Sequence, residues 1–153
     1  MFSACVIKDP SSSLAMAKAL AELGVDPTQV DSLNQTPLYY AVREGHFDVI
    51  DWLLEKGLVP NHIDTYGQTP IFYCIREGNI ATTTKLVSLG SDVDFIDNNG
   101  QSPMYYAIKH NQMEMIEFLI KQGVNLNVKD NKNATLVQEA TKRKRPIIVQ
   151  LLV

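Results

Sequence analysis

The chain repeats the segment Thr36-Pro37-Leu38-Tyr39-Tyr40-Ala41 twice more, as Thr69-Pro70-Ile71-Phe72-Tyr73-Cys74 and as Ser102-Pro103-Met104-Tyr105-Tyr106-Ala107. The copies begin 33 residues apart. Residues outside the segment recur at the same interval, namely Gly24, Gly57, Gly90 and Gly123, and Asp31, Asp64, Asp97 and Asp130. Self-similarity at a fixed period of this size is typical of stacked structural repeats. The sequence therefore predicts a repeat array.

Each repeat is expected to contain two short helices. Thr36 is placed to cap a helix whose first turn holds Pro37, where a missing N–H costs nothing and the ring pre-sets φ. That first helix is predicted over 37–44, ending at Gly45, which can adopt the left-handed conformation. A second helix is predicted over 47–56. The other repeats follow the same plan.

An extended loop follows each second helix and ends in a tight turn. The loop leads to one of the periodic aspartates, and the turns read Asp64-Thr65-Tyr66-Gly67 and Asp97-Asn98-Asn99-Gly100. Glycine at the end of such a turn supplies the conformation that the bend requires. We call each of these projecting turns a finger.

Together, the period, the Thr-Pro-Leu segments and the glycine after each leucine pair resemble the ankyrin repeat. The resemblance covers nearly the whole chain and implies an all-α fold, an ankyrin-repeat solenoid of stacked helix-turn-helix units with projecting β-turn fingers. It implies one domain over 1–153, composed of a degenerate N-terminal cap repeat (1–35), full repeats (36–68, 69–101, 102–134) and a partial C-terminal repeat (135–153). One departure is clear, because Tyr39, Phe72 and Tyr105 stand where the family has histidine. The turn must be held differently here.

Two details of the repeats leave alternatives open. The hydroxyls of Tyr40, Tyr73 and Tyr106 need partners if their rings are buried, so they either bond the backbone of a neighbouring finger or open onto the groove. We favour packing. The run Thr82-Thr83-Thr84 places hydroxyls where the preceding repeat has Val49-Ile50-Asp51. We expect a less stable second helix there.

Composition restricts the classes of function. The formal net charge is −3, and 45% of residues are apolar. A nucleic-acid partner is not expected, because such proteins normally carry a strong basic excess. Charge is uneven, however, with −5 over residues 1–77 and +2 over residues 78–153. No apolar run approaches the roughly 20 residues of a membrane span, so no membrane association is expected.

Catalytic and metal-binding patterns are not found in the sequence. The cysteines Cys5 and Cys74 are too few for a zinc site or a disulfide framework. The histidines His46, His62 and His110 do not have the spacing of a metal set or of a nucleophile with its base. We therefore expect no enzyme activity, no cofactor and no small-molecule substrate.

The resemblance implies that a protein or peptide binds in a concave groove formed by finger tips and the exposed side of the first helices. Carried over one repeat at a time, this places glutamines at the start of each repeat, Gln35, Gln68 and Gln101, on the binding surface. The finger-tip candidates are Leu33, Tyr66, Asn99 and Lys132. Candidates at the ends of the first helices are Arg43, Glu44, Arg76, Glu77, Lys109, His110 and Lys142.

Four of these residues share a register and a charge. Arg43, Arg76, Lys109 and Lys142 are each 33 residues apart, so stacking would align them as a cationic row suited to an acidic partner. The alternative is that helix C-termini favour cations in any case and that Glu44 and Glu77 neutralise their neighbours. Both interpretations remain open at this stage.

The expected function is a monomeric, cytoplasmic scaffold that holds a protein partner. The alternative is a targeting or regulatory domain of a longer multidomain protein, such as an enzyme or a channel. The basic run Lys142-Arg143-Lys144-Arg145 raises the alternative of nuclear import. The resemblance also implies a further alternative, hydroxylation of an asparagine at the finger base, a position held by Asn61 and Asn127.

Overall fold

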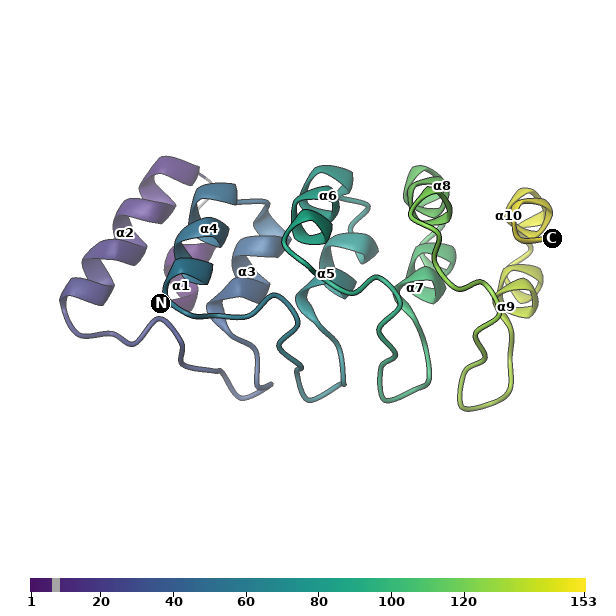
Figure 1. Cartoon of the computed structure of the whole chain (residues 1–153), viewed down its shortest axis with the longest axis horizontal. Coiled ribbons are helices and arrows are strands. Elements are labelled where there is room, and N and C mark those ends of the chain that lie inside the picture. The colour runs from purple at the N-terminus through teal and green to yellow at the C-terminus, as the bar shows by residue number, and fades with distance from the viewer. Residues whose placement is uncertain (7–8) are drawn as a thin grey trace.

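The computed structural model of the protein describes residues 1–6 and 9–153. Helices follow one another in pairs, and long loops join each pair to the next (Figure 1). No β-strand occurs in the described ranges, apart from an isolated bridge between Lys129 and Thr135. The helices are α1 Phe2–Cys5, α2 Pro10–Glu22, α3 Pro37–Glu44, α4 Phe47–Glu55, α5 Pro70–Arg76, α6 Ile80–Ser88, α7 Pro103–Lys109, α8 Met113–Lys121, α9 Leu136–Lys142 and α10 Pro146–Leu152.

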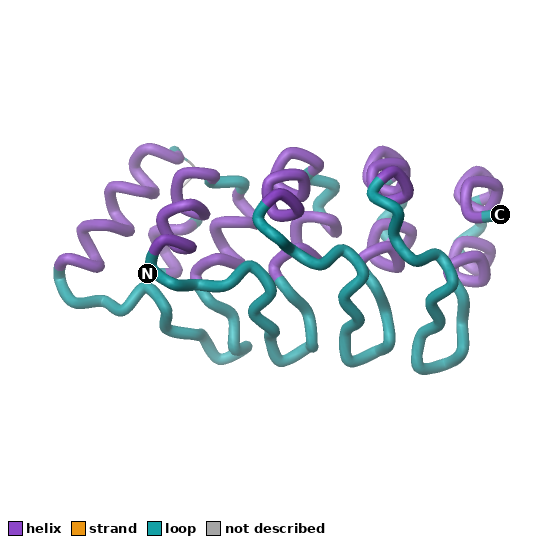
Figure 2. Tube along the Cα trace, in the orientation of Figure 1, coloured by secondary structure: helices purple, strands orange, loops and turns teal. Residues whose placement is uncertain are grey.

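The helix pairs stack side by side in two layers. The first helices of the pairs, α3, α5, α7 and α9, contact one another in sequence order and form the inner layer. The second helices form the outer layer, in which α2 contacts α4 and α6 contacts α8. Figure 2 shows the fingers projecting from one side of this array. The all-α solenoid expected from the sequence is therefore confirmed.

The predicted repeat boundaries can be compared with the helix pairs. Residues 1–35 contain α1 and α2, and residues 7 and 8 of this segment lie outside the described part of the chain. Residues 135–153 contain both α9 and α10.

In the described residues, no helix is long and apolar enough to cross a membrane.

The first helix of the second repeat begins at the predicted residue but is not capped in the predicted way. Thr36 precedes Pro37 at the start of α3, yet its side chain makes no capping hydrogen bond. The backbone N–H of Tyr39 instead donates to the Thr36 carbonyl at 3.1 Å. The Tyr39 N–H, to which the Thr36 hydroxyl would have bonded, is therefore already paired. The predicted geometry does occur at α9, where Thr135 and Gln138 form a reciprocal capping box.

Buried aromatic residues of the inner helices fill the space between repeats. Tyr39 and Phe72 are fully buried, and Tyr105 is nearly so. The Tyr39 hydroxyl lies 2.6 Å from the carbonyl oxygen of His62 and 2.8 Å from that of Gln68, both in the loop that leads to the next helix pair. The ring therefore packs in the core, and the hydroxyl ties the following loop to α3. This is how the turn is held at the position where histidine was missing.

The fingers are tied to one another through their backbones. The N–H of Thr65 donates to the carbonyl of Leu33 at 2.9 Å, and the N–H of Asn98 donates to the carbonyl of Tyr66 at 3.1 Å. The next finger continues the series, because Asn131 donates to Asn99 at 2.9 Å. Since each finger supplies an acceptor to the next, the tips form a ladder whose spacing is set by the helix stack.

Two of the three threonines of α6 enter the core, and Thr84 is exposed. Thr82 and Thr83 are fully buried. The Thr83 hydroxyl donates to the backbone carbonyl of Asn79 at 2.8 Å. The Thr82 hydroxyl has no hydrogen-bond partner among the described residues. A buried hydroxyl without a partner lowers stability by roughly 1–3 kcal/mol.

Replacing Thr82 with valine is expected to raise the free energy of unfolding by about 1 kcal/mol, because the shape is kept and the unpaired hydroxyl is removed. Chemical denaturation measures the change. The matched control is Thr83→Val, which removes a bonded hydroxyl and should destabilise the protein. A Thr82→Val variant no more stable than the wild type would show that the hydroxyl is satisfied in solution.

Candidate functional site

The base of the second repeat's finger is held by the carboxylate of Asp64, which is 5% exposed. Its Oδ1 accepts hydrogen bonds from the backbone N–H groups of Tyr66 and Gln68, each at 2.9 Å. Its Oδ2 accepts from the Tyr73 hydroxyl at 2.7 Å and from the Gln35 side-chain amide at 2.8 Å. One carboxylate therefore joins a finger, an inner helix and the preceding repeat.

The same arrangement recurs one repeat later. The Tyr106 hydroxyl donates to Asp97 Oδ2 at 2.6 Å, and the Gln68 amide reaches Asp97 at 3.0 Å and the Tyr106 hydroxyl at 2.7 Å. The corresponding pair one repeat earlier is Tyr40 and Asp31, whose hydroxyl and Oδ2 are 2.6 Å apart. The tyrosines are therefore bonded to carboxylates rather than to finger backbone, which neither of the sequence alternatives included.

This network corrects the expected position of two glutamines. Gln35 and Gln68 were expected to face a partner, but they are only 2% and 4% exposed. Their amides are used inside the molecule, between a carboxylate and a tyrosine hydroxyl. We therefore assign them to the structure of the fingers. Gln101 differs, because it is half-buried.

Burial and the neighbouring carboxylates shift the tyrosine pKa values upward. Burial raises the pKa of Tyr73, and the hydrogen bond to Asp64 raises it further. The same two causes, with Asp97 as the carboxylate, raise the pKa of Tyr106 to about 12. Both hydroxyls therefore remain protonated donors at neutral pH.

Cations lie between the tyrosine rings along the inner layer. The Arg43 guanidinium carbon is 5.5 Å from the centroid of the Tyr40 ring and 5.2 Å from that of Tyr73. The Arg76 guanidinium carbon is 5.0 Å from Tyr73 and 4.8 Å from Tyr106. Such cation–π contacts contribute about 0.5–1 kcal/mol at exposed sites. With Lys109 Nζ 5.7 Å from Tyr106, they form a cation–tyrosine ladder of Tyr40, Arg43, Tyr73, Arg76, Tyr106 and Lys109.

No carboxylate in the described part of the chain forms an ion pair with a ladder cation. Among the described residues, the ion pairs within 4.0 Å are Lys85 with Asp51 and Arg143 with Glu139. Glu44 and Glu77, which were candidate neutralising partners and candidate contacts, are exposed without such a pair. The geometry therefore does not support the neutralising alternative.

Hydrogen bonding and local charge further define the ladder. The Arg76 guanidinium donates to the Gln68 side-chain oxygen at 2.8 Å, which orients it toward the finger base. His110 is exposed beside Lys109. Burial lowers the pKa of His110, and the positive charges of Arg76 and Lys109 lower it further. His110 therefore stays neutral at neutral pH.

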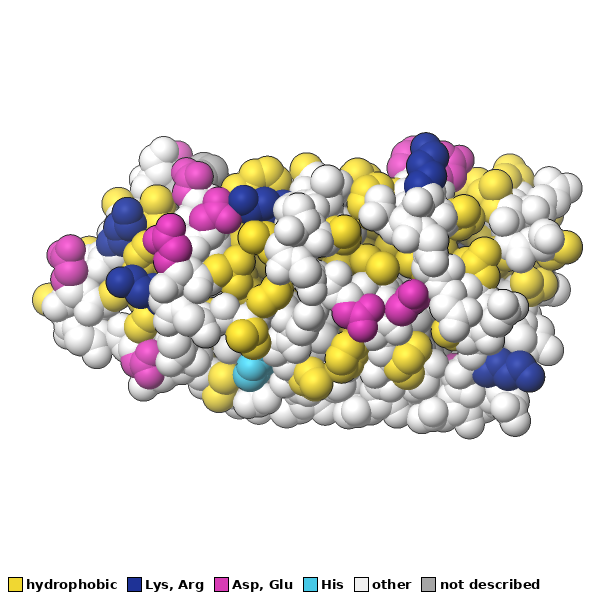
Figure 3. Space-filling view, in the orientation of Figure 1, with side chains coloured by type: hydrophobic (Ala, Val, Ile, Leu, Met, Phe, Trp, Pro, Cys, Tyr) yellow, Lys and Arg dark blue, Asp and Glu magenta, His cyan; other side chains and the backbone are white. Residues whose placement is uncertain are grey.

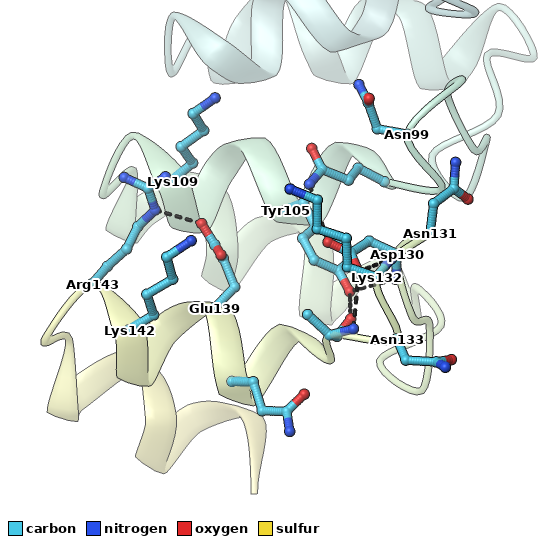
Figure 4. Close-up of a pocket in the computed structure, with 13 residues that line it drawn as sticks. Asn99, Tyr105, Lys109, Asp130, Asn131, Lys132, Asn133, Glu139, Lys142 and Arg143 are labelled. Atoms are coloured by element: carbon cyan, nitrogen blue, oxygen red, sulfur yellow. Dashed lines mark hydrogen bonds and ion pairs between the residues drawn. The ribbon is translucent and has the colours of Figure 1, made fainter.

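The fourth position of the row is built differently. Glu139, and not a tyrosine, stands one repeat after Tyr106, and it pairs with Arg143 at 2.5 Å. A cleft of about 680 Å³ opens here between the last finger and the ends of α7 and α9. Figure 4 shows Lys109, Lys142, Arg143 and Glu139 on its helical side, with the last finger opposite.

A family model described as ankyrin repeats (3 copies) matches residues 3–96 and 82–153. The chain belongs to the ankyrin repeat family. No curated protein matches the sequence. Ankyrin repeats are generally protein–protein interaction modules and are typically non-catalytic. In the described residues, no group of three His, Cys, Asp or Glu side chains is placed to hold a metal ion.

The finger-tip candidates of the ankyrin array lie on its surface. Leu33 and Tyr66 are 38% and 52% exposed, although both are apolar or aromatic. Asn99 and Lys132, one and two repeats further on, are also exposed. The hydrogen bonds between the fingers use backbone groups. The side chains at the tips therefore remain available to a partner. Exposed aromatic residues frequently anchor binding energy.

The two asparagines proposed as modification sites have different surroundings. Asn61 is half-buried, and its side chain donates to the Gly90 carbonyl at 2.9 Å and accepts from the Asp92 N–H at 3.0 Å. It therefore links one ankyrin loop to the next. Asn127 is exposed. Hydroxylation of either residue stays a prediction.

Sequence reasoning missed the role of the glutamines and aspartates in these ankyrin fingers. The signal was present, because each Asp is followed four residues later by Gln and nine residues later by Tyr, as in Asp64, Gln68 and Tyr73. The pattern fails in the last repeat, where Ala134 and Glu139 follow Asp130. This failure coincides with the cleft.

Proposed function

We propose that the inner face of this protein binds an acidic segment of a partner protein. The inner face is the surface formed by the cation–tyrosine ladder and the exposed finger tips. The observation that carries the proposal is that Arg43 and Lys109 are exposed and Arg76 half-buried, yet none forms an ion pair within the described part of the chain. Their charges are therefore available to a ligand.

Preorganisation supports the proposal. The Tyr73 ring lies between Arg43 and Arg76, and the Tyr106 ring lies between Arg76 and Lys109. Side chains already held in position lose less conformational entropy on binding than free ones. Guanidinium groups also bind carboxylates with two parallel hydrogen bonds. An extended acidic segment would therefore meet a row of positioned donors.

The cations of the ladder are regularly spaced. Figure 3 shows a face on which the Lys and Arg side chains are separated from one another by other side chains. The ladder cations instead recur once per repeat, with a tyrosine ring between neighbours. A regular row of one sign favours an oppositely charged partner and speeds its association.

In this proposal, the protein acts as a monomeric scaffold in the cytoplasm and works by binding and not by catalysis. Entry into the nucleus through the run 142–145 is the alternative. The support for it is that Lys142 is exposed at the end of α9, and Lys144 and Arg145 are exposed in the turn that follows.

The test uses a short fluorescein-labelled peptide of alternating glutamate and glycine and measures its binding by fluorescence anisotropy. The triple variant Arg43→Gln, Arg76→Gln, Lys109→Gln is expected to weaken binding about thirtyfold, since three charge contacts are lost. Raising the salt concentration should also weaken binding to the wild type.

A matched control removes the same charge from the outer helices. Lys18 is exposed on α2, Lys56 directly after α4, and Lys121 at the end of α8. Lys56 also lies 5.8 Å from the centroid of the Trp52 ring, so its loss removes a comparable cation–π contact. Changing all three to glutamine should leave binding nearly unchanged. Equal losses in the two triple variants would show that net charge alone, and not the ladder, attracts the peptide.

A further inference from the structure

The last inner position of the array lacks the aromatic ring that the preceding repeats have. Tyr40, Tyr73 and Tyr106 recur every 33 residues, and the next residue in this register is Glu139. In the earlier repeats, the ring packs edge to face on an aromatic residue of the preceding inner helix. The Tyr73 and Tyr39 centroids are 5.5 Å apart, and those of Tyr106 and Phe72 are 5.6 Å apart.

The cleft beside Glu139 is lined by residues equivalent to those that surround the tyrosine rings of the earlier repeats, but no tyrosine ring fills it. Its lining includes Gln101, Tyr105 and Asp130. These three correspond by register to Gln68, Phe72 and Asp97, which surround Tyr106. The cleft volume of about 680 Å³ leaves room for a phenol ring and the backbone that carries it.

The polar groups of the cleft are less completely bonded than their counterparts. The Gln101 amide lies 3.5 Å from Asp130 Oδ2, compared with 2.8 and 3.0 Å for the equivalent pairs of Gln35 and Gln68. The earlier glutamines also contact a tyrosine hydroxyl. Asp130 is half-buried, whereas Asp97 is buried. An acceptor and a donor are thus placed for a hydroxyl that the chain itself does not supply.

We propose that this cleft receives a tyrosine side chain of the partner, which completes the missing ring position. The hydroxyl donates to Asp130 Oδ2 and accepts from the Gln101 amide, as the Tyr106 hydroxyl does with Asp97 and Gln68. The ring packs on Tyr105, with Lys109 beside it. The inference rests on the proposed function, because it specifies one residue of the acidic segment bound by the ladder.

The chemistry of the cleft selects among aromatic ligands. A phenylalanine ring would fill the space but leave the Asp130 and Gln101 groups without their partner, and sites built for a hydroxyl reject analogues that lack it. A phosphorylated tyrosine would place its negative charge against the Asp130 carboxylate. Unmodified tyrosine therefore fits best.

The first test examines the cleft alone and does not depend on the acidic peptide. The probe is p-cresol, which has the side-chain chemistry of tyrosine, and toluene is the control without a hydroxyl. In amide-resolved NMR spectra, p-cresol is expected to shift the Gln101 side-chain amide and the backbone signals of Asp130 and Tyr105. Toluene should leave the Gln101 amide unchanged. Equal shifts of this amide with both probes, or no shift, would overturn the proposal.

Two variants of Glu139 make the test specific. Glu139→Tyr supplies the missing ring from within the chain, so it should abolish the p-cresol shifts and raise the melting temperature by about 3 °C. Glu139→Gln removes the charge pair with Arg143 without filling the cleft, so it should retain the p-cresol shifts. Persistence of the shifts in Glu139→Tyr would place the phenol elsewhere and contradict the proposal.

The second test separates this inference from the proposed function. The glutamate-glycine peptide is prepared with a central tyrosine or a central phenylalanine, and both are titrated against the wild type. The tyrosine peptide is expected to bind about tenfold more tightly, since its hydroxyl bonds a charged acceptor. Equal affinity, still dependent on the ladder cations, would overturn the tyrosine cleft and leave the acidic groove intact. If the triple variant without the ladder cations bound both peptides as tightly as the wild type, the proposed function would be overturned instead.

Discussion

Replacing Asp64 with asparagine is expected to lower the free energy of unfolding by about 3 kcal/mol. The Asp64 carboxylate accepts four hydrogen bonds, two from finger N–H groups and two from the side chains of Tyr73 and Gln35. An asparagine of the same shape keeps one oxygen and turns an NH₂ group toward donors. Hydrogen bonds to charged groups contribute about 1.5–3 kcal/mol, and an unpaired buried donor adds a cost. Urea denaturation followed by circular dichroism measures the change.

The matched control for this prediction is Asp130→Asn. Asp130 holds its finger through the N–H groups of Lys132 and Ala134, each at 2.9 Å, as Asp64 holds its own. Among the described residues, no tyrosine hydroxyl donates to its carboxylate, and the Gln101 amide is 3.5 Å away. We therefore expect a smaller loss of about 1 kcal/mol. Equal losses at the two positions would show that the tyrosine and glutamine bonds contribute nothing and that only the finger turn matters.

Replacing Gly67 with alanine is expected to cost about 3 kcal/mol, from two causes that add. Gly67 has φ +73°, which a residue with a Cβ adopts at a cost of about 1 kcal/mol. A Cβ at this position would also lie 2.8 Å from the backbone nitrogen of Asn98, in the next finger. That contact can be relieved only by separating the two fingers, because the obstacle is main chain. Thermal and chemical unfolding should both report the loss.

The control is Gly57→Ala, at the end of the second helix. Gly57 also has positive φ, +95°, but a Cβ there would meet nothing within 4 Å. The Gly57→Ala variant therefore measures only the cost of placing alanine at positive φ, for which we expect a loss of about 1 kcal/mol in the free energy of unfolding. If Gly57→Ala proved as destabilising as Gly67→Ala, the close approach of the fingers would not contribute to stability.

Local chemistry predicted most of the repeat plan. The proline after Thr36 and the glycine at position 45 gave α3 its correct bounds, because both act on their own stretch of backbone. The second helix ended at Glu55, one residue before the predicted end. The Thr36 cap was wrong for a physical reason, since a backbone carbonyl already accepts from the Tyr39 N–H.

The candidate site was harder to predict, because it depends on contacts between repeats. Spacing alone placed Arg43, Arg76 and Lys109 in one row, and the structure adds the tyrosine rings between them. Spacing also assigned Gln35 and Gln68 to the surface. The direction of a side chain depends on the partner that it finds, and here those partners lie 29 and 38 residues away in sequence. No single-repeat pattern contains that information.

The threonines of α6 illustrate the same division. Their position in a helix-packing stripe predicted burial, which Thr82 and Thr83 confirm. Whether each hydroxyl finds an acceptor depends on the surrounding packing. The Thr83 hydroxyl donates to the backbone carbonyl of Asn79, the residue before α6, and the Thr82 hydroxyl has no partner among the described residues.

The most direct test of the central claim is to locate the acidic peptide on the molecule. Titration of the unlabelled glutamate-glycine peptide is followed by NMR signals of the arginine side-chain Nε–H groups and the backbone amides. We predict that the Arg43 and Arg76 Nε–H signals shift most, together with amides at the ends of α3, α5 and α7. Shifts confined to the outer helices α2, α4, α6 and α8, with the Arg43 and Arg76 signals unmoved, would contradict the account.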